Sequence, residues 1–398
     1  LDGVPAAVQK RIIHDLDTVF YPETFVVPYL DVVHDRAVQE IFRGCIRGCR
    51  FCQAGFIYRP GRSKSADVVN RQARSLCDTT GYDEVSLCSL STSDYKELSR
   101  LLEQMLEWTD GDHVNISLPS LRIDNFPEEL LKKIQSVRKS GLTFAPEAGT
   151  QRMRDVINKG LTEEDIFSGA MEAFNGGWNR VKLYFMLGLP GETYDDIEGI
   201  AKLSNDIAAL YYTIPKDKRP GARVDVVSST SFFVPKPFTP FQWVPQNTTE
   251  QFKDKQHFLS HKMKEQLNRK SMRYNWHDFD LTALEGFLAR GDRKVGEVIY
   301  KAYKKGCMFD SWSEYFYYDR WLEAMDEAGV DPAFYTGRAR EYDEILPWDF
   351  IDAGVTKEFL WREYVQSQKE TVTPNCRMQC SGCGCRVYEG GVCFEGTN

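Results

Sequence analysis

Short apolar runs alternate with longer amphipathic stretches between residues 37 and 228. Apolar runs of this length predict strands, and apolar residues spaced three and four positions apart predict helices. The predicted strands cover residues 37–42, 84–90, 113–118, 141–145, 180–187 and 223–228. The predicted helices cover residues 66–77, 94–109, 127–139, 151–158, 163–175 and 193–210. Strands that alternate with helices predict an α/β fold, with a parallel sheet and right-handed crossover connections.

The pattern changes after the last of these strands. Residues 232–243 are rich in proline and aromatic side chains, which excludes a regular helix. This segment is either a rigid connection or a lip over an active site. In the second case Lys236 would face an anionic ligand. Further helices are predicted at 250–269 and 281–305. The chain therefore divides into four parts: a lead-in segment (1–36), an α/β unit (37–243), a mainly helical extension (244–370) and a cysteine-rich tail (371–398).

Composition narrows the class of protein. Of the 398 residues, 42% are hydrophobic and 27% are charged, which is typical of a folded globular chain rather than a disordered one. No apolar run is long enough to span a membrane, and the first residues show no secretory signal, so we expect a cytoplasmic protein without a membrane partner. The missing initiator Met indicates a processed chain or part of a longer one. The net charge of -8 means that a nucleic-acid partner would need a local basic patch.

The cysteines carry the most specific signal. Cys45, Cys49 and Cys52 form a C-x3-C-x2-C pattern. Three thiolates on one short loop can hold three irons of a [4Fe–4S] cluster and leave the fourth iron open to another ligand. Structural zinc needs four closed ligands, usually in C-x2-C pairs. No fourth Cys or His lies near these three cysteines, since His34 is eleven residues before Cys45, so the pattern favours an open cluster.

A second group of cysteines lies near the end of the chain. Cys376, Cys380 and Cys383 repeat the C-x3-C-x2-C spacing, and Cys385 and Cys393 follow in glycine-rich sequence with little core-forming material. Such a segment can fold around a metal. Four ligands are available, for instance Cys376, Cys380, Cys383 and Cys393, and both closed zinc and an auxiliary iron–sulfur cluster stay open. Because the two groups are far apart in sequence, we expect them to bind metal independently. The lone Cys77, Cys88 and Cys307 are expected to be small buried hydrophobic residues.

Residues 42–55 (Phe-Arg-Gly-Cys-Ile-Arg-Gly-Cys-Arg-Phe-Cys-Gln-Ala-Gly) resemble the cluster-binding loop of the radical S-adenosylmethionine (SAM) superfamily. The resemblance implies a partial (β/α)6 TIM-like barrel over residues 37–243, with its active site at the carboxyl ends of the strands, and SAM chelating the open iron. The whole chain is similar to a subgroup of radical SAM proteins without a settled function. In that subgroup a cobalamin-binding-like domain lies upstream, outside this chain.

The same resemblance implies a SAM site at the ends of successive strands. Phe51 precedes the third cysteine, as an aromatic residue usually does in the family. Ser91 and Ser93 stand where many members have a Gly-Gly-Glu-like segment. The other implied SAM-site residues are Ser117, Glu147, Gly188 and Glu192.

The implied activity is reductive cleavage of SAM to methionine and a 5′-deoxyadenosyl radical, with electrons from a flavodoxin- or ferredoxin-type protein. The substrate could be RNA, modified by methyl or methylthio transfer, or a protein or small metabolite. The non-catalytic alternative is an iron–sulfur scaffold or electron carrier. A run of basic residues either favours an anionic substrate or balances the charge of the cluster and SAM: Arg43, Arg47, Arg50, Arg59, Arg62 and Lys64.

Overall fold

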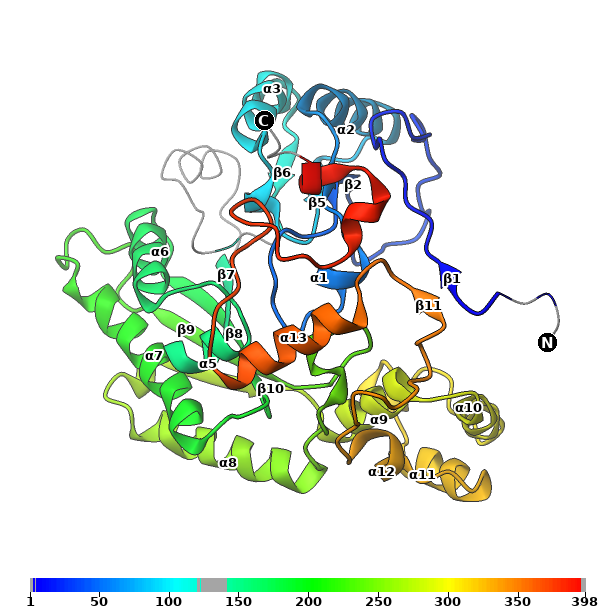
Figure 1. Cartoon of the computed structure of the whole chain (residues 1–398). Helices are drawn as coiled ribbons and strands as arrows, with labels where there is room; N and C mark the ends of the chain where they lie inside the picture. Colours follow the sequence, from blue (N-terminus) through cyan, green and yellow to red (C-terminus); the bar gives the residue numbers. More distant parts are fainter. Residues whose placement is uncertain (1–2, 4, 120–121, 123–141, 395–398) are drawn as a thin grey trace.

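The computed structural model describes residues 3, 5–119, 122 and 142–394 and shows an α/β protein with two parallel sheets (Figure 1). The first sheet has the order β2–β5–β6, formed by β2 (Ala37–Glu40), β5 (Glu84–Cys88) and β6 (Asn115–Ser117). The second has the order β10–β9–β8–β7, formed by β7 (Leu142–Glu147), β8 (Arg180–Leu187), β9 (Asp225–Phe232) and β10 (Met272–Trp276). All neighbouring strands in both sheets run parallel.

The six predicted strands are therefore confirmed, within a few residues at their ends. The seventh, β10, was not predicted, because most of its side chains are exposed or half-exposed and give no apolar run. It is nevertheless fully paired with β9, from Met272 opposite Val226 to Trp276 opposite Thr230. The helix predicted at 127–139 lies outside the described residues.

Helices pack on one face of each sheet. They are α2 (Ala66–Thr80) and α3 (Leu98–Asp112) on the first, and α6 (Glu163–Asn175), α7 (Tyr194–Thr213) and α8 (Thr249–Glu265) on the second. Ser65 caps α2 by accepting a hydrogen bond from the Val68 amide, and Thr162 forms a capping box with Asp165 on α6, as those residue types favour. The short α5 (Gln151–Val156) follows β7.

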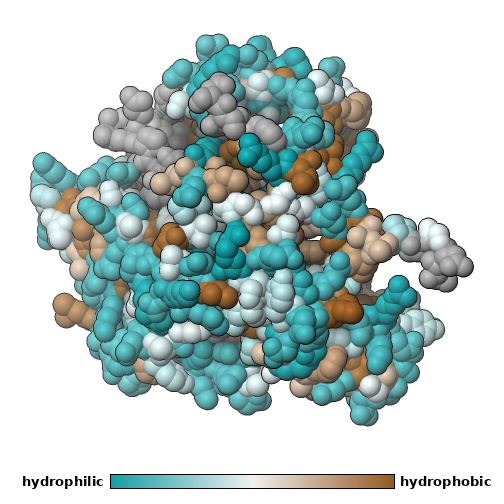
Figure 2. Space-filling view, in the orientation of Figure 1, coloured by the Kyte–Doolittle hydropathy of each residue, from teal (hydrophilic) through white to brown (hydrophobic). Residues whose placement is uncertain are grey.

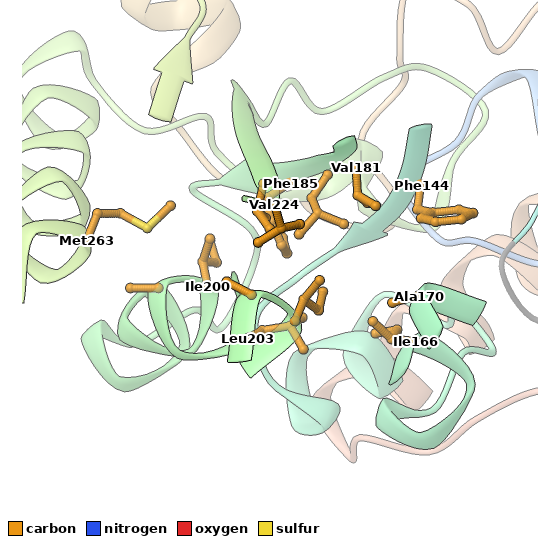
Figure 3. Packing of buried hydrophobic residues seen from close by; sticks show 14 of the residues in the cluster. Phe144, Ile166, Ala170, Val181, Phe185, Ile200, Leu203, Val224 and Met263 are labelled. Carbon is orange, nitrogen blue, oxygen red and sulfur yellow. The ribbon is translucent and has the colours of Figure 1, made fainter. Parts of the chain in front are cut away.

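Alternation along the strands decides which side chains meet the helices. Phe144, Val181, Phe185, Ile200 and Leu203 belong to one buried cluster of the second sheet and its helices (Figure 3). In the first sheet, Ala37, Val85 and Leu87 belong to the core with α2 and α3. Because side chains alternate across a strand, their neighbours point to the opposite faces, which are free to form a site.

The second half of the chain is mainly helical. Its helices are α9 (Phe279–Arg290), α10 (Lys294–Lys304), α11 (Tyr318–Glu327), α12 (Pro332–Thr336) and α13 (Lys357–Gln368). The helical stretch predicted at 281–305 is split at Gly291, where the backbone becomes extended. None of the described helices is both long and apolar enough to pass through a bilayer.

The remaining elements are short. β1 (Val8–Gln9) pairs with β11 (Ile351–Asp352), and β3 (Phe42–Arg43) pairs with β4 (Arg62–Ser63). Helix α1 covers Ala54–Ile57. The 3-10 turns are Thr92–Asp94, Pro240–Trp243, Arg269–Ser271, Ser313–Tyr315, Cys385–Tyr388 and Gly391–Phe394.

The tail does not stand apart from the α/β unit. The Cys376 amide donates to the Ile46 carbonyl (3.0 Å), and the Val392 amide donates to the Gly61 carbonyl (2.9 Å). Helix α13 and the tail, orange and red in Figure 1, lie beside α1 and the first cysteine loop. The two cysteine groups, distant in sequence, are thus neighbours in the fold.

Candidate active site around the first cysteine loop

Cys45, Cys49 and Cys52 lie on a compact loop between β3 and α1. The Cys52 amide donates to the Cys49 carbonyl (3.0 Å), and the Arg47 amide donates to the Cys45 thiol (3.4 Å). Gly44 enters the loop with φ +91°, and a Cβ there would lie 2.7 Å from the Tyr58 carbonyl oxygen. The tight turn therefore requires glycine at this position.

The three thiols lie close enough to influence one another. Burial and then the neighbouring Cys49 raise the pKa of Cys45 to about 12, and the same two causes raise the pKa of Cys52. The raised pKa values favour the protonated form of Cys45 and Cys52, so iron binding must displace their protons. Three soft sulfur donors on one loop fit a [4Fe–4S] cluster.

Glu147 lies next to this loop, held by an unusual backbone. It ends β7 after an irregularity in the pairing with β8, and its φ is +69°. Its Oε1 accepts an ion-paired hydrogen bond from Lys159 Nζ at 3.1 Å. Both side chains act electrostatically on Cys52. A strained non-glycine residue with a partly buried charge is typical of a functional position. The role of Glu147 in binding SAM stays a prediction.

Asp94 is a candidate site residue that the sequence reasoning missed. Arg47, which stands between Cys45 and Cys49, contacts both of its carboxylate oxygens, at 2.5 and 2.9 Å. Burial would raise the pKa of Asp94, but Arg47 and the Ser91 hydroxyl (2.7 Å) lower it overall. The carboxylate in turn acts on Cys45. As the first acid after the second strand, it could have been proposed in place of the expected glutamate.

The other predicted SAM-site residues have varied surroundings. Ser91 holds Asp94, and Ser93 accepts a hydrogen bond from the Arg122 amide (3.1 Å). Phe51 packs against the buried cluster around Met153. Ser117 pairs with Ser86 at the end of β6.

Gly188 and Glu192 close the loop that follows β8. The Gly188 amide donates to Glu192 Oε2 (2.8 Å), and Lys255 of α8 pairs with the same oxygen (2.7 Å). Burial is the main cause that raises the pKa of Glu192, despite this cation. Among the interactions of the described residues, none links Ser117, Gly188 or Glu192 with the cysteine thiols.

A cavity of about 970 Å³ lies beside the loop, at the carboxyl ends of β2 and β5. Glu40, Gly44, Cys88 and Phe238 are among its lining residues. Cys77 and Cys307 are buried as predicted, but the prediction for Cys88 was wrong, because its side chain is exposed in this cavity. A cavity of this size matches the usual range for ligand sites, roughly 300–1,000 Å³.

In the segment 232–243, the residue that lines the cavity is Phe238 rather than Lys236. Lys236 forms an ion pair with Glu285 of α9, so the cation is engaged within the protein. Phe238 instead lines the cavity, with φ +58° and its amide donating to Gln242 Oε1 (3.0 Å). The Gln53 amide side chain donates to the Pro237 carbonyl (3.2 Å) and ties this segment to the cysteine loop.

Comparison with known proteins identifies the central part of the chain. Residues 40–204 match the family model of the Radical SAM superfamily. The chain carries a radical SAM domain. This family uses a [4Fe–4S] cluster and SAM, as the sequence predicted, and Cys45, Cys49 and Cys52 all lie inside the matched residues.

The curated relatives include a protein without a named function and an enzyme named for a tRNA modification. An uncharacterized protein of Methanocaldococcus jannaschii is 30% identical over 73% of this chain and 60% of its own length. A tRNA-2-methylthio-N(6)-dimethylallyladenosine synthase of Solibacter usitatus is 35% identical over 46% of this chain and 43% of its own length. The chain thus spans less than two thirds of the length of each of these two relatives.

One solved structure gives a weaker match. The radical SAM methyltransferase of Kitasatospora setae, with cobalamin and a [4Fe–4S] cluster bound, has a TM-score of 0.42 and 15% identity. The match covers 52% of this chain and 38% of that one.

The basic run around the radical SAM loop is largely engaged in internal contacts. Arg43 pairs with Glu40, Arg47 with Asp94, and Arg50 with Glu363 of α13. Arg62 donates to the carbonyls of Pro60 and Ile13, and Lys64 donates to Gln72. These contacts do not single out an anionic substrate. They hold the loop, and through Glu363 they attach it to the C-terminal extension.

The tail cysteines lie outside the matched residues. Cys376, Cys380 and Cys383 all act electrostatically on Cys393, which indicates that the four thiols lie near one another. Cys385 lies beside Cys383 and interacts with it, but its thiol also donates to the Gly354 carbonyl at 3.2 Å. In the described part of the chain, no three potential ligands are gathered tightly enough for one metal ion. The tail thiols would therefore have to close around an ion or surround a larger cluster.

Proposed function

We propose that this chain is a radical SAM enzyme whose cluster is held by Cys45, Cys49 and Cys52. The observation that carries the proposal is the compact loop of three mutually influencing thiols inside the matched residues 40–204. When bound, the [4Fe–4S] cluster and SAM supply reductive cleavage of SAM and a 5′-deoxyadenosyl radical that abstracts hydrogen from a substrate. The protein binds and orients SAM and the substrate, and it excludes water from them.

The charged pairs beside the cysteine loop are suited to orienting SAM. The Glu147–Lys159 and Asp94–Arg47 pairs present both signs of charge near the thiols. SAM carries an amino group and a carboxylate, so paired charges of opposite sign can orient it. The cavity lined by Cys88 and Phe238 is the proposed place for the substrate, because it begins where Gly44 enters the cysteine loop.

The proposed architecture is a partial (β/α)6 TIM-like barrel. Two parallel sheets with helices on one face of each support it, and the cavity lies at the carboxyl ends of strands β2 and β5, where barrel enzymes have their sites. Strand β10 extends the second sheet beyond the six predicted strands.

Methylthio transfer is a second, more specific candidate. The relatives that favour it are the Solibacter usitatus synthase and a ribosomal protein uS12 methylthiotransferase of Bdellovibrio bacteriovorus, which is 24% identical over 48% of this chain. One is named for a tRNA and the other for a ribosomal protein, so they support a reaction type rather than a substrate. The net charge of -8 and the internal partners of the basic run give RNA no particular support.

The experiment is an anaerobic SAM-cleavage assay on the reconstituted, reduced chain, with 5′-deoxyadenosine and methionine as products. Cys45→Ala, Cys49→Ala and Cys52→Ala should each abolish cleavage, whereas the buried lone Cys77→Ala should retain it. Cleavage by a variant lacking all three loop cysteines would overturn the assignment. An intact cluster that never cleaves SAM would favour the scaffold alternative. Mass spectrometry of RNA and protein incubated with the enzyme tests methylthio transfer.

One partner protein, one neighbouring domain and the cellular location stay predictions from the sequence. They are a flavodoxin- or ferredoxin-type reductant, an upstream cobalamin-binding-like domain and a cytoplasmic location.

A further inference from the structure

Arg59 is a buried cation without an ion-pair partner among the described residues. Its side chain is 3% exposed, and its guanidinium lies 4.8 Å from the Phe56 ring centre and 5.7 Å from that of Phe359. Nε donates to the Gly55 carbonyl (3.0 Å) and Nη2 to the Arg47 carbonyl (3.0 Å). Nη1 is buried with no hydrogen-bond acceptor in the described part of the chain. A permanent charge in such surroundings calls for an anion.

The groups around this cation are the tail thiols. Phe56 and Phe359, whose rings both lie near the guanidinium, share one buried cluster with Cys383 and Cys385. Cys376, Cys383 and Cys385 are the ionisable groups that act on Arg59. Arg59 acts in turn on Cys376, Cys383 and Cys393. A zinc ion or a [4Fe–4S] cluster held by four thiolates is a dianion, which a buried guanidinium can balance.

We propose that Arg59 is the fixed counter-charge of an all-thiolate metal centre formed by Cys376, Cys380, Cys383 and Cys393. Cys385 is left out because its thiol already donates to the Gly354 carbonyl. Arg59 is a positioning residue here, since it lies beside the ligands and supplies none.

The same guanidinium connects the tail centre with the first cysteine loop. Its Nη2 bond ends on Arg47, between Cys45 and Cys49, and its Nε bond ends on Gly55, just after Cys52. Loading the tail with metal therefore fixes a group that supports the radical SAM loop. This inference does not depend on the proposed SAM chemistry, because it concerns metal held by other cysteines.

Arg290 provides a matched control. It is also fully buried and has no ion-pair partner among the described residues, but it donates to the carbonyls of Tyr335 and Val244 and lies near another cation, Arg340. No cysteine acts on it. A variant of Arg290 removes a buried guanidinium without touching the tail.

The experiment uses the full chain with Cys45, Cys49 and Cys52 all replaced by Ala, so that bound metal belongs to the tail. Metal and sulfide analysis after anaerobic purification distinguishes zinc from an iron–sulfur cluster. Zn²⁺ is then titrated against a chelator. Arg59→Gln should weaken Zn²⁺ binding about 10- to 100-fold, as loss of a supporting group around metal ligands does. Arg59→Lys, which keeps the charge, should bind Zn²⁺ more tightly than Arg59→Gln. Arg290→Gln should bind Zn²⁺ as tightly as the parent, which is the chain with only the three loop cysteines replaced.

A thermal unfolding measurement, with and without Zn²⁺, separates this role from a general structural one. Zn²⁺ should raise the melting temperature of the parent more than that of Arg59→Gln, because only the parent has a buried cation for the dianion to neutralise. Equal shifts in both, or equal Zn²⁺ affinities, would overturn the proposal. A parent chain that binds neither zinc nor iron would also overturn it. If Arg59→Gln does not fold, Arg59→Lys is compared with Arg290→Gln. Similar Zn²⁺ affinities of these two variants would support the charge role, whereas a complete loss of Zn²⁺ binding in Arg59→Lys alone would overturn it.

Discussion

The Cys376 amide donates a hydrogen bond to the Ile46 carbonyl, 3.0 Å away, and so joins the first residue of the tail motif to the loop between Cys45 and Cys49. Asn158 makes a parallel connection. Its side-chain amide donates to the carbonyls of Gly48 (3.0 Å) and Thr373 (3.2 Å), and its oxygen accepts from the Thr373 amide (2.9 Å). The site is therefore assembled from both ends of the chain.

Gly44→Ala should prevent the first cysteine loop from forming correctly. A Cβ at this residue combines a positive φ with a 2.7 Å contact to the Tyr58 carbonyl, and the clash and strain together should cost about 3 kcal/mol. Iron content after reconstitution and urea unfolding are the measurements. Gly81→Ala is the control, because Gly81 also has a positive φ (+76°) but open space around it. If both variants lose iron equally, strain in the loop is not the cause.

Glu147→Gln should weaken SAM binding while leaving the iron content unchanged. The substitution keeps the size of the side chain but removes the charge that pairs with Lys159 beside Cys52. Loss of one charged contact predicts about 10-fold weaker binding, or about 1.4 kcal/mol. Isothermal titration of the reconstituted chain with SAM measures it, with the exposed Glu164→Gln as control. An unchanged affinity would make Glu147 a purely structural residue.

Stability should fall in acid partly through Asp196. Burial opposes ionisation of this residue, but Arg152, the Thr150 hydroxyl and the Thr193 amide lower its pKa below the usual 3.8. A lowered pKa in the folded state stabilises the protein above the unfolded pKa, and this contribution is lost as the pH falls from about 4. Asp196→Asn should therefore be less stable than wild type at pH 7, with a difference that narrows in acid.

Urea unfolding at several pH values tests this expectation. The neighbouring Asp195→Asn serves as control, because Asp195 is exposed in the first turn of α7. A difference between Asp196→Asn and wild type that stays constant down to pH 3 would contradict the expectation.

Much of the fold could be predicted because buried strands leave a strong apolar pattern. Strand β10 could not, since its exposed residues are ordered by pairing with β9. Cys88 illustrates a signal that was present but unused. Cys88 lies on the same face of β5 as Ser86, whereas Val85 and Leu87 lie on the opposite face and belong to the core. Strand alternation therefore directs Cys88 away from the core.

The site was predictable only where a motif carries it. The loop cysteines follow from their spacing, whereas the role of Asp94 depends on Arg47 reaching it across the fold. The basic run illustrates the same limit. Arg50 pairs with Glu363 and donates to the Thr371 carbonyl, more than three hundred residues later, a contact that no local pattern encodes.

Truncation before Cys376 should shorten the lifetime of the first cluster, contrary to the independence expected from sequence distance. The truncated chain loses the bond to the Ile46 carbonyl, the Arg377 bond to the Asp94 carbonyl (2.7 Å) and the thiols around Arg59. Solvent then reaches a loop that the tail now covers, so iron should be lost to a chelator about 10-fold faster, as for other supporting groups.

The matched control for the truncation is the full chain with Cys376, Cys380, Cys383 and Cys393 replaced by Ala. It keeps the backbone bond from residue 376 to Ile46 but cannot bind metal in the tail. An intermediate rate of iron loss in this variant would assign part of the protection to the backbone cover and part to the tail metal. A truncated chain that retains its cluster as long as the full chain would restore the view that the two cysteine groups act independently, because the contacts seen between them would then carry no stabilising free energy.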